Sequence, residues 1–395
     1  MVPYIAPWRR GLGLRVPYTD GNRVRNFLKF FEFEIEARSD RARAARLRTP
    51  HGVIHTPIFM PVGTAGSVKG LTATQLEEIG AQIILANTYH MHVRPGEDLV
   101  RELGGLHGFT GFTRPFLTDS GGYQVMSLAA LRKRTEESVV FRSHLDGARL
   151  ELSPERSIDI QMKLGADIIM AFDECPPWPA TREEVIDATE RTARWAERSK
   201  RAHTREDQWL FGIVQGGVHD DLRAQSARAI TSIGFPGYAI GGLSVGEPKE
   251  DMVRVLEVMD RALPEDQPRY LMGVGTPEDL LDGIARGVDM FDCVLPTRNA
   301  RNGQVFTWRG KMTLKNAKYA RDASPLDPDC RCPTCRIASR AYLRHLHMSN
   351  EMTGAVLSTL HNLFFYLDLV GKARESIVAG RFETFRQETL KGFAA

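Results

Sequence analysis

No stretch of this 395-residue chain approaches the roughly 20 consecutive apolar residues that a membrane span needs, so we expect no membrane anchor. The first thirty residues are interrupted by Arg9, Arg10 and Arg15 and lack an apolar segment, which argues against a secretory signal. Cysteine is scarce, with five in all, and three of them lie within six residues. This odd, clustered set argues against a disulfide framework and for a reducing compartment. We therefore expect a cytoplasmic protein.

The chain also lacks a large excess of charge, since its formal net charge is only +3. The charge is unevenly placed, however, because the segment from Arg298 to Arg321 contains seven Lys or Arg residues and no Asp or Glu. Such a run is often just a solvated face. Here it follows an apolar segment that ends near Asp292, and a basic run beside an acid favours phosphate binding next to a reactive carboxylate. This neighbourhood predicts an enzyme that acts on nucleic acid.

Short apolar runs that end in polar or glycine residues recur along the chain, and most are separated by segments with helical signals. We interpret eight of them as buried strands: Val53–Gly63, Ala81–Asn87, Pro115–Gly122, Ala166–Glu174, Leu210–Gly217, Tyr238–Ser244, Arg269–Gly275 and Met290–Pro296. Eight strands alternating with amphipathic helices are typical of a (β/α)8 TIM barrel of the α/β class. A doubly wound open sheet is the competing architecture. The barrel is favoured because polar residues gather at the carboxyl end of nearly every run.

Local signals support the element assignment. Thr181 and Glu184 form a capping box ahead of an amphipathic helix. Between the third and fourth runs, 138–141 and 149–152 flank Asp146-Gly147, which predicts a β-hairpin with a tight turn.

The predicted domain organisation is one barrel with an insertion. Residues 31–395 form the catalytic barrel domain, and residues 302–370 within it form a small zinc-binding subdomain near the C-terminus. A helix near Glu375–Lys391 then closes the barrel. Residues 1–30 are expected to be a loose N-terminal extension.

The cysteine cluster predicts a metal site. The thiolates are Cys330, Cys332 and Cys335, and the candidate imidazoles are His345, His347 and His361. Three thiolates and one imidazole match tetrahedral Zn²⁺ with no open position, which indicates one structural zinc ion per chain. His361 is preferred because a separate helix, of about residues 351–370, can bring it back to the thiolates.

Two acids at strand ends are candidates for catalysis. Asp119 follows the third run and Asp292 ends the eighth. Opposed carboxylates across a barrel mouth suit substitution at an anomeric carbon, with one acting as nucleophile and the other moving a proton. Each acid could instead cap a backbone turn, and spacing alone does not show that the two converge.

Other strand ends carry groups that suit a purine. The carboxylate of Asp173 accepts N–H bonds, while Gln215 and a glycine N–H such as that of Gly242 donate to a carbonyl. Together they would read the edge of guanine. Tyr123 and Met272 offer flat and polarizable faces for a stacked ring.

Taken together, these segments resemble the tRNA-guanine transglycosylase family, and they occur in the family order over about Phe31 to the C-terminus. The matching segments are 118–124 (TDSGGYQ), 172–175 (FDEC), 212–217 (GIVQGG), 241–243 (GGL), 271–275 (LMGVG), 291–293 (FDC), 296–298 (PTR) and the cysteine cluster. The resemblance implies a (β/α)8 barrel with an inserted zinc subdomain that replaces guanine at the tRNA wobble position with a 7-deazaguanine.

The resemblance also implies roles for individual residues. Asp292 corresponds to the nucleophile that attacks C1′ and forms a covalent ribosyl-enzyme, and Asp119 to the general acid-base residue. Base-binding positions are Asp119, Ser120, Gly121, Gly122, Tyr123, Asp173, Gln215, Gly242, Leu243, Glu247 and Met272. RNA-contacting positions are Gly273, Val274, Gly275, Thr276, Pro277, Glu278, Asp279, Thr297, Arg298, Asn299, Ala300 and Arg301. The zinc ligands are Cys330, Cys332, Cys335 and His361.

Finer details resemble the bacterial subclass. Cys175 and Val245 match the pattern that accepts 7-aminomethyl-7-deazaguanine, and Glu247 with the Leu243 carbonyl resembles the sensor for its ammonium group. The expected partners are tRNA with a GUN anticodon, a 7-deazaguanine base and a second copy in a homodimer, with no membrane.

Two other function classes compete. A retaining glycoside hydrolase would use the same barrel and two carboxylates, but it leaves the basic run without a role. A non-catalytic zinc-bearing RNA-binding module would leave the strand-end acids unexplained.

Overall fold

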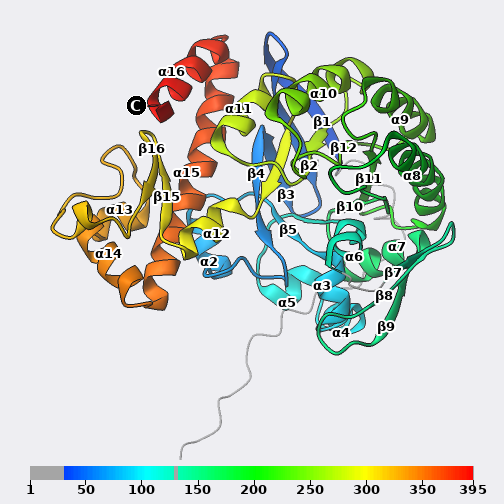
Figure 1. The fold of residues 1–395 in the computed structure, drawn as a ribbon, viewed down its shortest axis with the longest axis horizontal. Coiled ribbons are helices and arrows are strands. Elements are labelled where there is room, and N and C mark those ends of the chain that lie inside the picture. The colour runs from blue at the N-terminus through cyan, green and yellow to red at the C-terminus, as the bar shows by residue number, and fades with distance from the viewer. Residues whose placement is uncertain (1–30, 129–131, 395) are drawn as a thin grey trace, which may run out of the picture.

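The computed structural model describes residues 31–128 and 132–394, so the expected loose extension at residues 1–30 lies outside the described residues. Eight parallel strands close into a barrel in sequence order, and the last strand pairs with the first (Figure 1). They are β4 Ile58–Gly63, β5 Ile84–Ala86, β6 Phe116–Thr118, β10 Ile168–Met170, β11 Trp209–Val214, β12 Tyr238–Ile240, β13 Arg269–Leu271 and β14 Met290–Cys293. The predicted TIM barrel is confirmed, and each predicted run supplies one strand.

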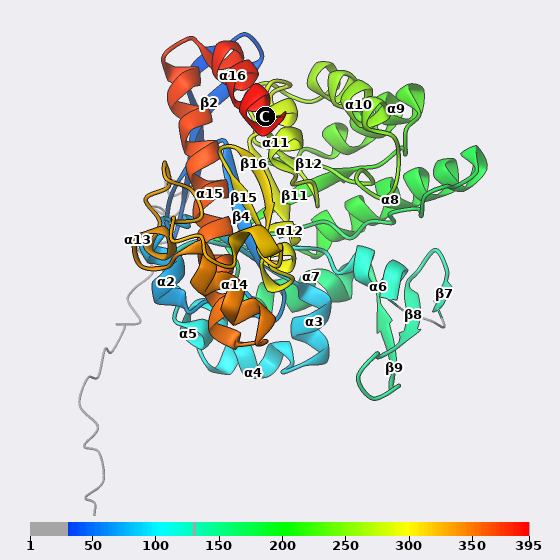
Figure 2. The same ribbon diagram turned by 60° about the vertical axis from the view of Figure 1, so that its left-hand side comes forward.

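Helices cover the outside of the barrel (Figures 1 and 2). Up to the last strand and just beyond it they are α2 Ala73–Glu78, α3 Thr88–Val93, α4 Glu97–Glu102, α5 Gly105–Thr110, α6 Gly122–Leu128, α7 Pro154–Leu164, α8 Arg182–Ala202, α9 Asp220–Ile233, α10 Lys249–Ala262, α11 Pro277–Ile284 and α12 Leu295–Arg301. Helix α8 begins at the predicted capping box, where Thr181 accepts from the Glu184 N–H and Glu184 accepts from that of Thr181. Among the described residues, no helix combines the length and apolarity that crossing a membrane requires.

A three-stranded antiparallel sheet precedes the barrel. It consists of β1 Glu32–Ser39, β2 Ala42–Thr49 and β3 Gly52–Thr56. The first predicted run, Val53–Gly63, was therefore too long, because its first four residues belong to β3. Pro57 separates β3 from β4, since a proline has no N–H to give to a strand ladder.

The predicted hairpin is confirmed, but its turn is wider than expected. Strands β8 Val139–Arg142 and β9 Arg149–Leu152 pair antiparallel, and β7 Arg132–Arg134 adds a third strand. The Ser143 N–H donates to the Ala148 carbonyl at 2.8 Å, so a four-residue loop, 144–147, joins the strands. Asp146-Gly147 forms only the second half of this loop.

The segment after α12 forms its own small core. Its elements are β15 Gln304–Thr307, β16 Gly310–Thr313, η1 Ala317–Tyr319, α13 Pro333–Ile337 and α14 Arg340–Met348. A separate cluster of buried side chains holds them together: Val305, Leu314, Leu326, Ala338, Leu343 and Leu346.

One long helix joins this segment to the barrel. Helix α15 runs over Met352–Val378 and packs on β4, β1 and β2, and α16 covers Phe382–Ala394. The expected break near residue 370 was wrong, since the helix continues through Gly371, where no atom crowds the missing side chain. The chain instead turns at Gly380, whose φ of 67° is left-handed and suits glycine.

A buried ion pair fixes the antiparallel sheet to the barrel. Arg43 of β2 and Asp289, which precedes β14, are 1% and 0% exposed. Arg43 Nε donates to Asp289 Oδ1 at 2.9 Å, and its other nitrogens donate to the carbonyls of Glu265 and Gln267. Asp289 also accepts from the Arg269 N–H at 2.7 Å. The guanidinium nitrogens of Arg43 and the carboxylate oxygens of Asp289 therefore all have hydrogen-bond partners inside the protein.

We expect Arg43→Met to lower the free energy of unfolding by about 3–5 kcal/mol, because the Asp289 carboxylate would stay buried without its partner. Arg46→Met is the matched control on the same strand. Arg46 pairs with Glu34 at the surface, where water screens the charges, so its loss should cost far less stability than the loss of Arg43. Urea unfolding followed by circular dichroism measures both, and equal losses would contradict the expectation.

Candidate active site

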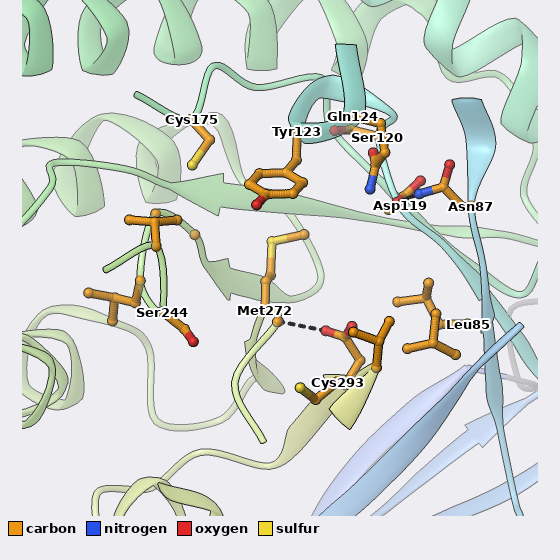
Figure 3. Close-up of a pocket in the computed structure, with 18 of the residues that line it drawn as sticks. Leu85, Asn87, Asp119, Ser120, Tyr123, Gln124, Cys175, Ser244, Met272 and Cys293 are labelled. Carbon is orange, nitrogen blue, oxygen red and sulfur yellow. Dashed lines mark hydrogen bonds between the residues drawn. The ribbon is translucent and has the colours of Figure 1, made fainter. Parts of the chain in front are cut away.

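A cavity of about 480 Å³ lies at the carboxyl ends of the barrel strands (Figure 3). This is where a TIM barrel places its active site. The structure brings most of the predicted catalytic and base-binding residues together here, with two of the predicted RNA-contacting residues. Those that line the cavity are Asp119, Ser120, Tyr123, Asp173, Gln215, Gly242, Leu243, Met272, Gly273, Asp292 and Arg298.

Asp119 follows β6 and is held by the neighbouring strand end. Asn87 Nδ2 donates to its Oδ2 at 2.5 Å, and the Thr88 N–H donates to its Oδ1 at 2.8 Å. Burial raises the pKa of Asp119 to about 7, and the negative charge of Asp292 adds to the rise, against the lowering effect of the Thr88 N–H. A carboxyl group with this pKa can both give and take a proton near neutral pH.

Asp292 lies in β14 and receives two donors. The Tyr270 hydroxyl donates to its Oδ1 at 2.6 Å, and the Gly273 N–H donates to the same atom at 2.7 Å. Burial raises the pKa of Asp292, while these two donors lower it. Burial, followed by the charge of Asp292, also keeps the pKa of Tyr270 well above its usual value, so the phenol stays protonated and donates. Oδ2 is the oxygen that receives neither bond.

Asp173, after β10, and Gln215, after β11, hydrogen-bond to each other. Gln215 Nε2 donates to Asp173 Oδ2 at 2.8 Å, and the Ser120 hydroxyl donates to Oδ1 at 2.8 Å. The Oε1 atom of Gln215 is buried and has no hydrogen-bond donor among residues 31–128 and 132–394. A base that hydrogen-bonds to both Asp173 and Gln215 would therefore replace the bond between these two side chains and could donate to the free Oε1 of Gln215.

The predicted stacking residues enter the cavity from different sides. Tyr123 begins α6 and is half exposed, and Met272 follows β13; Figure 3 shows both side chains in the site. Gly121 and Gly122 do not line the cavity. They shape the turn before Tyr123, where a side chain on Gly122 would lie 2.5 Å from the Asp173 carbonyl oxygen.

Glu247 does not line the cavity either. Its two carboxylate oxygens accept from the N–H groups of Ser244 and Val245, at 2.5 and 2.9 Å. The side chain thus fixes the loop after β12, in which Leu243, Ser244 and Val245 face the cavity.

The predicted RNA-contacting segments are partly buried. Thr276 and Pro277 begin α11, and in the second segment residues 297–301 lie in α12, a helix that the sequence did not indicate. The buried positions are Val274, Gly275, Pro277, Thr297 and Ala300, so contacts with a large ligand fall on the remaining positions.

Two of the predicted RNA-contacting residues are cations: Arg298, which lines the cavity, and Arg301, which ends α12. Neither has a carboxylate partner within the described part of the chain. Burial and the charge of Arg298 lower the pKa of Arg301, which places two positive charges close together at the edge of the cavity.

The metal-binding prediction converges on one cluster. The candidate ligand atoms of Cys330, Cys332, Cys335 and His361 all lie within 4.8 Å of one another. The thiol sulfurs lie 3.7, 3.4 and 3.4 Å from His361 Nδ1, close to the about 3.6 Å that a tetrahedral ion with ordinary zinc bond lengths would give. His361 Nε2 lies 2.8 Å from the Phe306 carbonyl, which leaves Nδ1 for the ion. The residues therefore fit a structural metal ion.

Three residues at the site were missed from the sequence. Asn87 and Thr88 hold Asp119, and Tyr270 holds Asp292. Asn87 ends a predicted strand, and a polar residue at a strand end could have indicated that it belongs to the site. Tyr270 gave none, because a tyrosine within a strand is typical of a packed core.

Comparison with known proteins agrees with this geometry. The family model described as "Queuine tRNA-ribosyltransferase" matches residues 38–395. A queuine tRNA-ribosyltransferase of Halothermothrix orenii is 59% identical over 353 residues, covering 89% of this chain and 95% of that protein. Those of Pelotomaculum thermopropionicum and Geobacillus kaustophilus are 54% and 56% identical, covering 92% and 91% of this chain and 98% and 94% of theirs. The chain therefore belongs to the queuine tRNA-ribosyltransferase family of pentosyltransferases.

Proposed function

We propose that this protein exchanges the wobble guanine of GUN-anticodon tRNAs (Asp, Asn, His and Tyr) for 7-aminomethyl-7-deazaguanine, in queuosine biosynthesis. The exchange proceeds through a covalent ribosyl-aspartate. The observation that carries the proposal is that Asp119, which is buried, and Asp292, which is partly buried, line one cavity and are each held by donors from neighbouring strand ends.

Asp292 is the nucleophile of the proposal. Its Oδ1 is held by Tyr270 and Gly273, which leaves Oδ2 to attack C1′ of the ribose. The C1′–N9 bond breaks as the C1′–O bond forms, and the glycosidic bond energy is kept in the ester, so no nucleotide cofactor is needed. The target base must first leave the stack of the anticodon loop to enter the cavity.

Asp119 moves the proton. In its neutral form it protonates the departing guanine, and as a carboxylate it then takes the N9 proton of the entering base. N9 attacks C1′ and frees Asp292. A pKa of about 7 suits both half-reactions, since the donor and acceptor forms are then similarly populated near neutral pH.

Asp173, Gln215 and the Gly242 N–H would read the purine edge, with the ring between Tyr123 and Met272. Cys175 and Val245, which both line the cavity, would border the 7-substituent. Glu247 fixes the loop that carries the Leu243 carbonyl, the acceptor assigned to the ammonium group.

Binding of the tRNA backbone beside the cavity is supported by Arg298 and Arg301, which have no carboxylate partner among the described residues. We also propose that the protein forms a homodimer, and only the family resemblance supports this.

We further propose a barrel domain of residues 31–395 that contains a zinc subdomain of residues 302–370, supported by that segment's separate core.

The first test is incorporation of labelled guanine into unmodified GUN-anticodon tRNA. The wild type should incorporate it, and 7-aminomethyl-7-deazaguanine should suppress incorporation. Asp292→Asn should lower the exchange rate at least about 1,000-fold, because the nucleophile is gone, while tRNA binding changes less than about twofold.

A second readout separates the covalent route from direct displacement. The wild type with tRNA should give an RNA–protein band on a denaturing gel, and Asp292→Asn should give none. An Asp292→Asn enzyme that exchanges base at the wild-type rate would rule out the mechanism.

The pH dependence follows from the two acids. The reaction needs neutral Asp119 and ionised Asp292, so kcat/KM for tRNA should fall about tenfold per pH unit above pH 7 as Asp119 ionises. Because the pKa of Asp292 is raised, the acidic limb should begin above the usual range for an aspartate. Rates measured from pH 5 to 9.5 test this, and a flat profile from pH 7 to 9 would remove Asp119 as the proton donor.

We assign the Cys330, Cys332, Cys335 and His361 cluster to one structural Zn²⁺, since four soft or borderline donors leave no open position. Elemental analysis should find one zinc per chain in the wild type and close to none in His361→Ala, whose melting temperature should also fall. His345→Ala is the matched control, because His345 is exposed and lies outside the cluster. Zinc loss in the control but not in His361→Ala would refute the assignment.

A further inference from the structure

The hairpin β7–β9 is the largest feature near the cavity to which the proposed function gives no role. It follows directly after α6, which carries the cavity residue Tyr123, and in Figures 1 and 2 it stands out from the barrel beside α6. Its loop touches the cavity wall, because the His144 ring packs edge-on against His90, which lines the cavity.

The hairpin is held firmly in place. Tyr89 Oη lies 2.6 Å from His144 Nδ1 in the loop, and Trp195 Nε1 of α8 donates to the Glu136 carbonyl at 2.7 Å at the opposite end. Between them, Arg134 of β7 forms an ion pair with Glu174, a carboxylate that is 1% exposed. A segment tied at three points presents its outer face in a fixed position relative to the cavity.

That outer face carries positive charge without carboxylate partners among the described residues, although Arg142 Nη1 donates to the Gly147 carbonyl at 3.1 Å. Arg142 of β8 and Arg149 of β9 lie directly opposite each other, and both are exposed. Within residues 31–128 and 132–394, neither lies within ion-pair distance of a carboxylate, nor does Lys133 of β7. Two like charges on facing residues destabilise a strand pair, so this arrangement is favourable only with an anion.

Three of the four acids of the hairpin bond to the protein itself, and the fourth, Glu137, is exposed in the turn between β7 and β8, at the end of the hairpin away from Arg142 and Arg149. Glu136 pairs with Arg194, Glu151 accepts from Ser138, and Asp146 accepts from the Ala148 N–H. Hydrogen bonds from Ser143 and the Ala148 N–H lower the pKa of Asp146, and the charge of Arg94, an exposed residue that follows α3, adds to this, which places that charge near the loop.

We propose that Arg142 and Arg149 form a second contact for the phosphate backbone of the bound tRNA, on a different side of the cavity from Arg298 and Arg301. The inference rests on the proposed function for the identity of the RNA. Guanidinium groups bind phosphate oxygens in pairs, and residues facing each other across strands lie about 5 Å apart at their Cα atoms, so the two long side chains can reach neighbouring phosphates.

The test is the salt dependence of tRNA binding, measured by fluorescence anisotropy with labelled unmodified tRNA. Arg142→Gln/Arg149→Gln should weaken binding roughly tenfold at 0.15 M salt and reduce the slope of log K against log salt by about 1.5, as expected for two lost phosphate contacts. In exchange assays KM for tRNA should rise, while kcat and KM for the base stay the same.

Two matched variants make the result specific. Arg201→Gln/Arg228→Gln removes two exposed arginines of α8 and α9, on the outer helix layer, that form no ion pair with any described residue, and it should leave both affinity and slope unchanged. Arg142→Lys/Arg149→Lys keeps the charges and should keep the slope.

An Arg142→Gln/Arg149→Gln variant with the wild-type slope would overturn the proposal, as would an equal loss in the Arg201→Gln/Arg228→Gln control. The two proposals can fail separately. If the Arg142→Gln/Arg149→Gln variant shows the expected loss of slope but the wild type never exchanges base, the proposed function fails while the tRNA contact stands.

Discussion

The burial of three carboxylates at the mouth of the barrel is the constraint on which the rest of the site depends. Asp119 and Asp173 are buried, Asp292 is partly buried, and the loss of water around them is the main cause of the raised pKa of each. Such groups are tolerated only where donors replace the lost water. Barrel closure supplies those donors, because the carboxyl ends of adjacent strands bring Thr88 to Asp119 and Gly273 to Asp292.

The same burial is costly to stability. A carboxyl group whose pKa is higher in the folded chain than in the unfolded chain favours unfolding once the pH rises through that interval. For Asp119 this interval runs from its usual value near 4 to about 7, and the penalty is fully present above it. Satisfied polar groups elsewhere, such as the Arg43–Asp289 pair, keep the fold intact around these acids.

Much of the fold could be predicted from the sequence, because apolar runs with polar ends report buried parallel strands directly. The first run misled, since β3 is apolar enough to look continuous with β4 across Pro57. The helix expected over about residues 351–370 was too short, because α15 continues to Val378. The acids and the metal ligands carry local motifs and were found. Tyr270 has a core-like context, and its contact with Asp292 exists only once β13 and β14 are adjacent.

Helix α15 belongs to both cores of the protein. Its His361 faces the thiols, Asn362 bonds the Pro296 carbonyl, and Tyr366 donates to the Gly275 carbonyl. Farther along, Arg374 donates to carbonyls of β2 and β3, near the start of the described chain. During synthesis on the ribosome, β4 is made long before β14, which pairs with its edge, and before α15, which packs on it. A nascent chain therefore exposes an unpaired strand edge until almost all of it has emerged, and in that interval it is most open to aggregation or to capture by a chaperone.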